Sequence, residues 1–307
     1  MVAVESGAVD VERTDAAAAA IRHHYDIGNE FYRLWLDPTL SYSCALRENP
    51  DDTLELAQEH KLNHHLNAIG VERAGSVLDI GCGWGAILDR VSRQPAITRA
   101  VGLTLSDEQA EYVRAQNYPG VEVRVEDWLH YQPADRFDGI ISIGAFEHFA
   151  RPDDAPAEKI RVYREFFTRC RDWLRPDGTL SLQTIAYANM TAAQANTFMQ
   201  REIFPDAELP TLAEITAAAD GLFEVCAVTN GRLDYAWTCA EWARGLRAHR
   251  AEATALVGAE AVARYERYLK LSAMGFRMGK LTLFRLVLRP YGSGFFEAKS
   301  SREEGRA

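Results

Sequence analysis

A glycine-rich loop carries more chemical information than any other part of this chain. An apolar segment at residues 76–80 leads into Gly81, Gly83 and Gly85. Glycine lets the backbone turn sharply and leaves it uncovered, so that a ligand can lie directly against it. A helix expected from Ala86 would point its first unpaired N–H groups at the same ligand. The sequence therefore predicts a strand, a loop and a helix that together hold a cofactor.

The spacing of these glycines indicates which cofactor fits. The loop reads Gly-x-Gly-x-Gly, whereas the dinucleotide fingerprint has two residues before its third glycine and an acidic residue about 20 positions later. The nearest comparable stretch, Thr-Leu-Ser-Asp at residues 104–107, does not match that pattern. The mismatch argues against a nicotinamide site. An acid before the loop, Asp79, suits a ligand with an amino-acid group and a nucleoside, such as S-adenosylmethionine. The alternative is an ordinary strand–turn–helix unit.

A carboxylate and an imidazole follow the strand expected at residues 137–143. Glu147 and His148 are adjacent. On a regular element they would therefore point in different directions, one into a pocket and the other bracing it. A carboxylate that follows an apolar strand, under aromatic side chains, can stabilise a developing cation or accept a proton. The alternative is a glutamate that caps the next turn.

Two further pairs follow neighbouring strands. Trp128 can lie flat on an adenine while Asp127 accepts a hydrogen bond from the exocyclic amine; a helix cap and a packed tryptophan are the alternative. Thr104 and Gln109 follow the second strand, where a ribose sits in this architecture. A cap and a solvated helix residue are the alternative for that pair.

The residues before the first strand and near residue 235 favour packing roles when taken alone. Tyr25, Tyr42, Ser43 and Cys44 lie in the first segment, where tyrosine and cysteine are typical packing residues. Tyr235 lies near a helix start, at a spacing that is more typical of a core than of a site.

Hydrophobic periodicity predicts the elements that position these residues. Helices are expected at 29–36, 53–69, 107–116, 158–175 and within 237–274, and strands at 76–80, 100–103, 121–125, 137–143, 179–185, 223–229 and 281–288. Alternation of strands and helices implies a parallel sheet with helices on both faces. Ligands bind at the carboxyl ends of such strands. We therefore expect the loops after Ile80, Leu103, Val125, Ile143 and Ile185 to share one mouth.

The pattern divides the chain into four parts. Residues 1–75 are expected to form an N-terminal helical arm and cap, and residues 76–186 the cofactor-binding core. Residues 187–221 interrupt the alternation of strands and helices and are predicted to form a helical lid insertion. Residues 222–307 carry the last strands and the C-terminal helices. An alanine-rich helix near residue 18 buries little area by itself, so it is a candidate contact with a second subunit.

Composition excludes several classes of protein. The chain has 307 residues and a net charge of -10, from 34 basic and 44 acidic side chains, which argues against a nucleic-acid partner and mildly against an anionic membrane surface. An acidic carrier protein would need a local basic patch. No apolar run approaches the ~20 residues of a membrane span, and the first residues lack the basic start of a signal peptide. The five cysteines match no disulfide or metal pattern, and the paired histidines are adjacent, so a cytoplasmic protein without a metal is expected.

Several stretches in this order and spacing resemble the cyclopropane-fatty-acid synthase and mycolic acid cyclopropane synthase family. The match runs from about Tyr25 to Leu288. The stretches that carry it are Tyr-Asp-Ile-Gly-Asn-Glu-Phe-Tyr at 25–32, Ser-Tyr-Ser-Cys-Ala at 41–45, Asp-Ile-Gly-Cys-Gly-Trp-Gly at 79–85, Gly-Leu-Thr-Leu-Ser at 102–106, and Ser-Ile-Gly-Ala-Phe-Glu-His-Phe at 142–149.

The resemblance implies an α/β fold with a Rossmann-like seven-stranded class I methyltransferase sheet and helical caps over the active site. It implies an S-adenosylmethionine-dependent methyltransferase. The family pattern assigns Tyr42, Ser43, Gly81 and Gly83 to the methionine end of the cofactor, Thr104 and Gln109 to its ribose, and Asp127 and Trp128 to its adenine. Tyr25, Asp79, Leu105 and Ile143 complete the predicted cofactor-binding set.

The resemblance also implies a bicarbonate beside the methylated carbon. Its family ligands match Cys44, Glu147, Tyr235, the backbone at Ile185 and a histidine two residues earlier. This chain has Gln183 at the histidine position. A neutral amide can donate a hydrogen bond to an anion but is neither a cation nor a good base. Because the bicarbonate is thought to take the final proton in ring closure, the change argues against cyclopropanation and leaves methyl transfer to carbon unaffected.

The leading hypothesis is thus a C-methyltransferase that acts on an alkene carbon of a lipophilic substrate, an unsaturated acyl chain or a prenyl-type side chain, through a carbocation. Glu147, Tyr235, Cys44 and Gln183 are the predicted catalytic residues. Presentation of the substrate by a carrier protein or a membrane remains open. The alternatives are an N-methyltransferase for a small amine, a cyclopropane synthase proper, and a cofactor-binding sensor without catalysis.

Overall fold

A seven-stranded sheet organises the part of the chain that the structure describes. The computed structural model describes residues 27–191 and 208–292. Within these residues the strand order is β3-β2-β1-β4-β5-β7-β6. The strands are β1 (Ser76–Ile80), β2 (Arg99–Thr104), β3 (Val121–Val125), β4 (Phe137–Ile143), β5 (Leu174–Tyr187), β6 (Phe223–Asn230) and β7 (Leu281–Pro290). The expected α/β sheet is confirmed.

Strand direction changes at one end of the sheet. The strands from β3 to β5 are parallel to their neighbours, as the alternating pattern predicts. By contrast, β7 runs antiparallel to both β5 and β6. The expectation of a parallel sheet was therefore wrong for the closing strand. Hydrophobic periodicity records which residues of a strand are buried, and it carries no information on strand direction.

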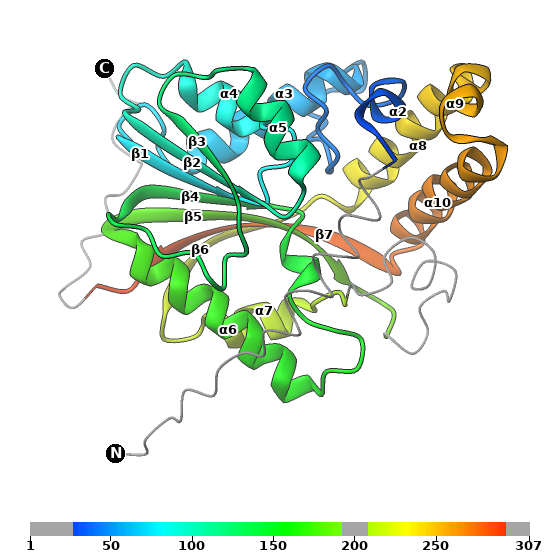
Figure 1. The fold of residues 1–307 in the computed structure, drawn as a ribbon. Helices are drawn as coiled ribbons and strands as arrows, with labels where there is room; N and C mark the ends of the chain where they lie inside the picture. Colours follow the sequence, from blue (N-terminus) through cyan, green and yellow to red (C-terminus); the bar gives the residue numbers. More distant parts are fainter. Residues whose placement is uncertain (1–26, 192–207, 293–307) are drawn as a thin grey trace, which may run out of the picture.

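The helices lie on both sides of the sheet and at one end of it. Figure 1 shows α3, α4 and α5 on one face and α6 and α7 on the other, with α2, α8, α9 and α10 grouped at the end of the sheet. The helices are α2 (Asn29–Arg33), α3 (Leu54–Ala68), α4 (Ala86–Ser92), α5 (Asp107–Ala115), α6 (Pro156–Trp173), α7 (Leu212–Ala219), α8 (Arg232–Ala248), α9 (Arg250–Val257) and α10 (Ala259–Arg277).

Local sequence explains most of the boundaries. The N-cap Ser106 of α5 accepts a hydrogen bond from the backbone N–H of Gln109 at 3.3 Å, as expected for a serine before a helix. Helix α2 ends at Arg33, earlier than predicted, and turns carry the chain toward Pro38, where the missing N–H prevents further helix. Strand β5 begins at Leu174, directly after α6, and not at the predicted residue 179.

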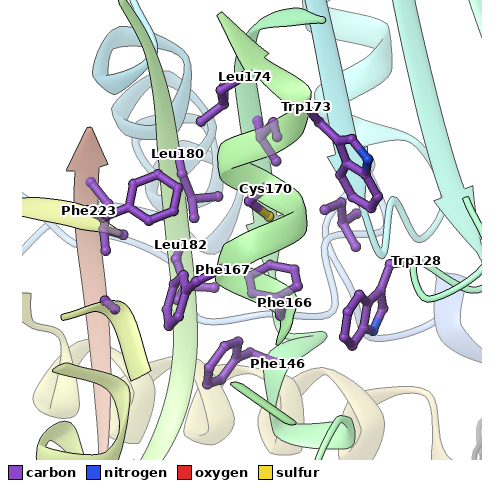
Figure 2. Close-up of a cluster of buried hydrophobic side chains, with 14 of the residues drawn as sticks. Trp128, Phe146, Phe166, Phe167, Cys170, Trp173, Leu174, Leu180, Leu182 and Phe223 are labelled. Atoms are coloured by element: carbon purple, nitrogen blue, oxygen red, sulfur yellow. The ribbon is translucent and has the colours of Figure 1, made fainter. Parts of the chain in front are cut away.

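Aromatic and aliphatic side chains fill the layer under α6. Figure 2 shows Phe166, Phe167 and Cys170 of α6 near Leu180 and Leu182 of β5. All of these side chains are buried. This layer holds β4 and β5, and therefore the loops that follow β4, in fixed positions.

Some predicted features lie outside the described residues. They are the alanine-rich helix, with its candidate subunit contact, Tyr25, and the part of the predicted lid at 192–207. Within residues 27–191 and 208–292, none of the helices is long and apolar enough to cross a bilayer.

Candidate functional site

A pocket opens at the carboxyl ends of β1, β2, β3 and β4. We call it the glycine-loop pocket. Eleven of the twelve residues predicted to bind a cofactor line it; they are Tyr42, Ser43, Asp79, Gly81, Gly83, Thr104, Leu105, Gln109, Asp127, Trp128 and Ile143. The twelfth, Tyr25, lies outside the described residues. The expectation that the loops after the first four strands share one mouth is confirmed.

The glycine loop exposes bare backbone to this pocket. Gly81 and Gly83 have φ angles of 80° and 53°, a region that favours glycine. A Cβ on Gly83 would meet no atom within 4 Å, whereas one on Gly81 would lie 2.7 Å from the Cβ of Ala145. The N–H groups of Gly81 and Cys82 donate hydrogen bonds to the carbonyl oxygen of Leu103, both at 2.9 Å. The loop is thus tied to β2 while its outer surface stays open.

The polar residues after β2 are buried against each other. Thr104 and Gln109 are 5% and 4% exposed, so the alternative of a solvated helix residue is wrong for Gln109. The hydroxyl of Thr104 donates a hydrogen bond to Oε1 of Gln109 at 2.8 Å. This bond fixes the amide and leaves its N–H₂ group as a donor toward the pocket.

Asp127 and Trp128, which follow β3, act as a turn cap and a packed ring, and they also form part of the pocket wall. Oδ1 of Asp127 accepts a hydrogen bond from the backbone N–H of Leu129 at 2.8 Å, and so caps a turn. The Trp128 ring packs against Phe149 and Phe166, with centroid distances of 4.9 and 5.4 Å. Both residues nevertheless line the glycine-loop pocket, so packing positions the tryptophan at the pocket wall.

Helix α3 holds the segment that closes the pocket from the other side. Nε2 of Gln58 donates to the carbonyl oxygens of Ser41 and Ser43. Nζ of Lys61 donates to the hydroxyl oxygens of the same two serines, each at 3.2 Å. Sequence reasoning missed both residues. The available signal was their spacing, because Gln58, Lys61 and His65 recur at intervals of three and four residues, which places them on one face of α3, and the structure buries that face.

A smaller cavity adjoins the glycine-loop pocket. We call it the Glu147 cavity. It shares Tyr42, Ser43, Gly144 and His148 with the larger pocket, and its remaining wall consists of Glu147, Gln183, Ile185, Leu209, Tyr235, Tyr268 and Leu283. Three of the four predicted catalytic residues therefore lie together here. The expectation for the fifth strand was wrong, because β5 continues past Ile185 to Tyr187, and Ile185 itself lines this cavity and not the larger pocket.

Glu147 is a buried carboxylate, and one of its two oxygens can still accept a hydrogen bond. It lies on the 3₁₀ turn Phe146–His148 and is 4% exposed. Its Oε1 accepts a hydrogen bond from the backbone N–H of Ile185 at 2.6 Å, which excludes a local cap. Its Oε2 is buried and has no hydrogen-bond partner among the described residues. Burial raises the pKa of this carboxyl to about 7, against the lowering effect of the Ile185 amide.

The pKa of Glu147 predicts a pH-dependent cost to the fold. An unfolded glutamate has a pKa of ~4.3, so the folded protein binds the proton more tightly and its free energy of unfolding decreases as pH rises toward about 7. Between pH ~5 and ~8, the free energy of unfolding of Glu147→Gln should rise relative to that of the natural protein by about 3 kcal/mol. Urea denaturation of both proteins at several pH values measures this difference. A difference that does not change with pH would contradict the assignment.

His148 does not act as a simple brace for Glu147. Both residues line the Glu147 cavity, although adjacent residues were expected to point in different directions. The reason is the 3₁₀ turn on which they lie, which has no strand-like alternation. Burial lowers the pKa of His148 to about 4, so its imidazole is neutral at pH 7.

Gln183 is held by an arginine that sequence reasoning missed. Nε of Arg285, directly opposite on β7, donates to Oε1 of Gln183 at 2.8 Å. Nε2 of Gln183 then points toward the carbonyl oxygen of Cys44 at 3.4 Å. Arg285 is 3% exposed and forms an ion pair with Asp234, Nη1 to Oδ2, at 3.5 Å. The signal was an arginine inside an otherwise apolar strand.

Cys44 lies behind this amide and not in the cavity wall. Its Sγ is 3.4 Å from Nη2 of Arg285, and the residue is absent from the lining of both pockets. Burial raises the pKa of its thiol to about 12, so the thiol is not a nucleophile at neutral pH. Its predicted place among the catalytic side chains is therefore corrected to a supporting position. Tyr235, in contrast, lines the cavity while its ring stacks on Phe276 at 4.5 Å.

Residues 27–191 and 208–292 contain no cluster of metal-ligating side chains. No group of three or more histidine, cysteine, aspartate or glutamate side chains there is arranged to hold a metal ion. The arrangement instead offers an acid, an amide, phenols and aromatic faces around a mostly apolar space.

The chain is similar in sequence and in structure to cyclopropane synthases. The family model for mycolic acid cyclopropane synthetase matches residues 12–286. Cyclopropane mycolic acid synthase 2 of Mycobacterium leprae is 36% identical over 272 residues, which cover 81% of this chain and 86% of that protein. Among solved structures, the cyclopropane synthase MmaA2 from Mycobacterium tuberculosis has a TM-score of 0.79 at 34% identity, over 89% of this chain and 98% of that chain. The mycolic acid cyclopropane synthase CmaA1, complexed with SAH and CTAB, has a TM-score of 0.80 at 33% identity, with the same coverage.

Proposed function

Because this chain belongs to the mycolic acid cyclopropane synthase family, we propose that it is an S-adenosylmethionine-dependent methyltransferase whose acceptor is an alkene carbon of a lipophilic substrate. The proposed substrate is an unsaturated acyl chain or a prenyl-type side chain. The ligands in the CmaA1 structure support this proposal, since SAH is the demethylated form of that cofactor and CTAB carries a long alkyl chain.

The glycine-loop pocket fits this cofactor in shape and charge. The backbone at Gly83 is open to the pocket, and Asp79 is a buried carboxylate to which no side chain in residues 27–191 and 208–292 donates a hydrogen bond. When bound, the cofactor supplies an electrophilic methyl group on a sulfonium. We propose that the methionine end is held by Tyr42, Ser43, Asp79, Gly81 and Gly83, the ribose by Thr104 and Gln109, and the adenine by Asp127 and Trp128, with Leu105 and Ile143 as apolar walls.

Glu147 is the observation that carries the proposed reaction. Transfer of a methyl group to an alkene leaves a positive charge on the substrate. The unpartnered Oε2 of Glu147 offers an opposite charge in a water-poor cavity, where such a charge has its largest effect. The rings of Tyr42, Tyr235 and Tyr268 line the same cavity and can stabilise a cation through their faces.

The change to Gln183 supports loss of the final proton from a substrate carbon over its loss from the transferred methyl group, which would close a ring. The amide oxygen of Gln183 accepts a hydrogen bond from Arg285 and its N–H₂ group donates to the carbonyl oxygen of Cys44, so Gln183 offers no base to the cavity. Glu147 is then the remaining acid–base group with a pKa near neutrality in the cavity. We propose a methyl-branched alkene as the product, with a cyclopropane as the alternative.

A product screen with methyl-deuterated S-adenosylmethionine tests the proposal. Fatty acyl, prenyl and amine substrates are incubated with the enzyme, and products are analysed by mass spectrometry. The proposed product retains all three deuterium atoms on carbon, whereas ring closure through the methyl group removes one. Label found on nitrogen, or no label in any lipid or prenyl pool, would contradict the proposal.

We also propose a reducing compartment, the cytoplasm. The observation that supports it is that all five cysteines are free.

A further inference from the structure

Lys61 is a buried ammonium that forms no ion pair with a carboxylate in the part of the chain that the structure describes. The residue is 2% exposed in the middle of α3. Its Nζ donates to the hydroxyl oxygens of Ser41 and Ser43, each at 3.2 Å. No aspartate or glutamate in residues 27–191 and 208–292 forms an ion pair with it. An ammonium has three donor hydrogens, so one remains beyond the two hydroxyl partners.

A second buried lysine, Lys159, is neutralised by carboxylates of the protein itself. Lys159 of α6 is 7% exposed, and its Nζ forms ion pairs with Glu208 at 2.9 Å and Glu214 at 3.3 Å. A buried charge is costly unless it is paired, because the protein interior solvates ions poorly. Lys61 forms no such ion pair within residues 27–191 and 208–292, and the carboxylates of Asp37 and Asp79 act on it only from a distance, so its direct counter-charge is expected to come from a ligand.

The position of Lys61 identifies that ligand. Lys61, Ser41, Ser43 and Asp79 all line the glycine-loop pocket. Two buried ionisable groups, the Lys61 amine and the Asp79 carboxyl, therefore border the same space. Burial raises the pKa of Asp79 to about 7, while the charge of Lys61 opposes that rise and favours the carboxylate. The amino-acid end of S-adenosylmethionine is a zwitterion, with one ammonium and one carboxylate. Asp79 suits the ammonium of that end, and Lys61 suits its carboxylate.

We propose that Lys61, together with the hydroxyl of Ser43, binds the carboxylate of the methionine portion of the cofactor. This inference rests on the proposed function, because it assigns one more residue to the proposed cofactor. Lys61 thus sets the preference of the pocket for adenosyl ligands that carry an intact amino acid, while Asp127 and Trp128 hold the other end.

The electrostatics of α3 are consistent with this role. Burial lowers the pKa of Lys61 to about 8, while the nearby carboxylates of Asp37 and Asp79 oppose that shift. The lysine is therefore still mostly protonated at pH 7. A bound carboxylate adds a further negative charge and keeps the ammonium ionised when the pocket is occupied.

Three ligands test the inference by isothermal titration calorimetry of the full-length protein. They are S-adenosylhomocysteine, decarboxylated S-adenosylmethionine and 5′-methylthioadenosine, which lacks the whole amino-acid end. For Lys61→Met, affinity for S-adenosylhomocysteine should fall about 10- to 100-fold, the range expected for loss of a charged hydrogen bond. Affinity for the two ligands without a carboxylate should change less than about twofold, because they never contact Lys61.

Controls separate a binding role from a structural one. Lys61→Arg keeps the cation and should bind S-adenosylhomocysteine more tightly than Lys61→Met. Lys159→Met removes a buried ammonium outside the pocket and should leave affinity for all three ligands unchanged. Thermal unfolding of each variant shows whether it is folded. The natural protein alone gives an independent test. Its affinity for S-adenosylmethionine should exceed its affinity for the decarboxylated form by the same 10- to 100-fold.

Two results would overturn the assignment. One is a natural protein that binds the decarboxylated ligand as tightly as the intact one. The other is a folded Lys61→Met variant that loses affinity equally for S-adenosylhomocysteine and for 5′-methylthioadenosine, which would make Lys61 a packing residue of the pocket. If the natural protein binds none of the three ligands, the proposed cofactor itself is wrong, and that failure is distinct from the other two.

Discussion

Replacing Glu147 by glutamine is expected to lower turnover about 10²- to 10³-fold, the effect of removing one charge from a preorganised, water-poor site. Glutamine keeps the shape of the side chain, and its Oε1 can still accept the hydrogen bond from Ile185 that Glu147 makes. Only the negative charge at the unpartnered Oε2 is lost. Affinity for S-adenosylhomocysteine should stay within about twofold, because Glu147 lines the smaller cavity and not the glycine-loop pocket.

The measurement is the initial rate at pH ~8, where the raised pKa of Glu147 leaves the carboxyl ionised, together with calorimetric binding of S-adenosylhomocysteine. Glu165→Gln is the matched control. Its carboxylate is partly exposed and paired with Arg169 on the surface of α6, so its loss should not affect the rate. Turnover like that of the natural protein in Glu147→Gln would remove Glu147 from the proposed reaction.

Replacing Gly83 by valine is expected to abolish measurable binding of S-adenosylhomocysteine. Gly83 has a φ of 53°, and a Cβ there would meet no protein atom within 4 Å, because it would project into the space proposed for the cofactor. A β-branched side chain at a positive φ is also strained. The variant thus fills the pocket and distorts the loop that lines it.

Gly221→Val separates these two effects. Gly221 also has a positive φ, 69°, and a Cβ at this position would meet no atom within 4 Å, but the residue lies outside the glycine-loop pocket. The variant should lose stability by a similar amount and retain affinity for S-adenosylhomocysteine. Calorimetry with both variants, each first shown to be folded, measures the difference. Unchanged affinity in Gly83→Val would mean that the ligand does not lie on the glycine loop.

The sequence predicted the sheet and the loops of the site because these depend on local signals. Apolar runs placed β1, β3 and β4 within a residue of their observed bounds. The glycines at 81, 83 and 85 predicted the loop after β1, and the structure gives all three a positive φ. Once four loops end at the same edge of a sheet, residues such as Asp127 and Thr104 must meet in one pocket.

The features that the sequence did not predict depend on contacts between distant segments. The antiparallel direction of β7 has no signature in its own residues. The spacing of Lys61 and the apolar surroundings of Arg285 in sequence indicate burial, but their partners, Ser43 and Gln183, come from other segments of the chain. Cys44 was predicted as a site residue from the family resemblance, and in the structure its Sγ lies beside Arg285, behind Gln183.

The decisive measurement is a crystal structure of the protein with S-adenosylhomocysteine. We expect adenine against Trp128 and Asp127, the amino-acid end at Gly83 and Lys61, and the sulfur facing the cavity that contains the Oε2 of Glu147. A ligand bound elsewhere, or a Glu147 side chain turned away from the sulfur into solvent, would contradict it.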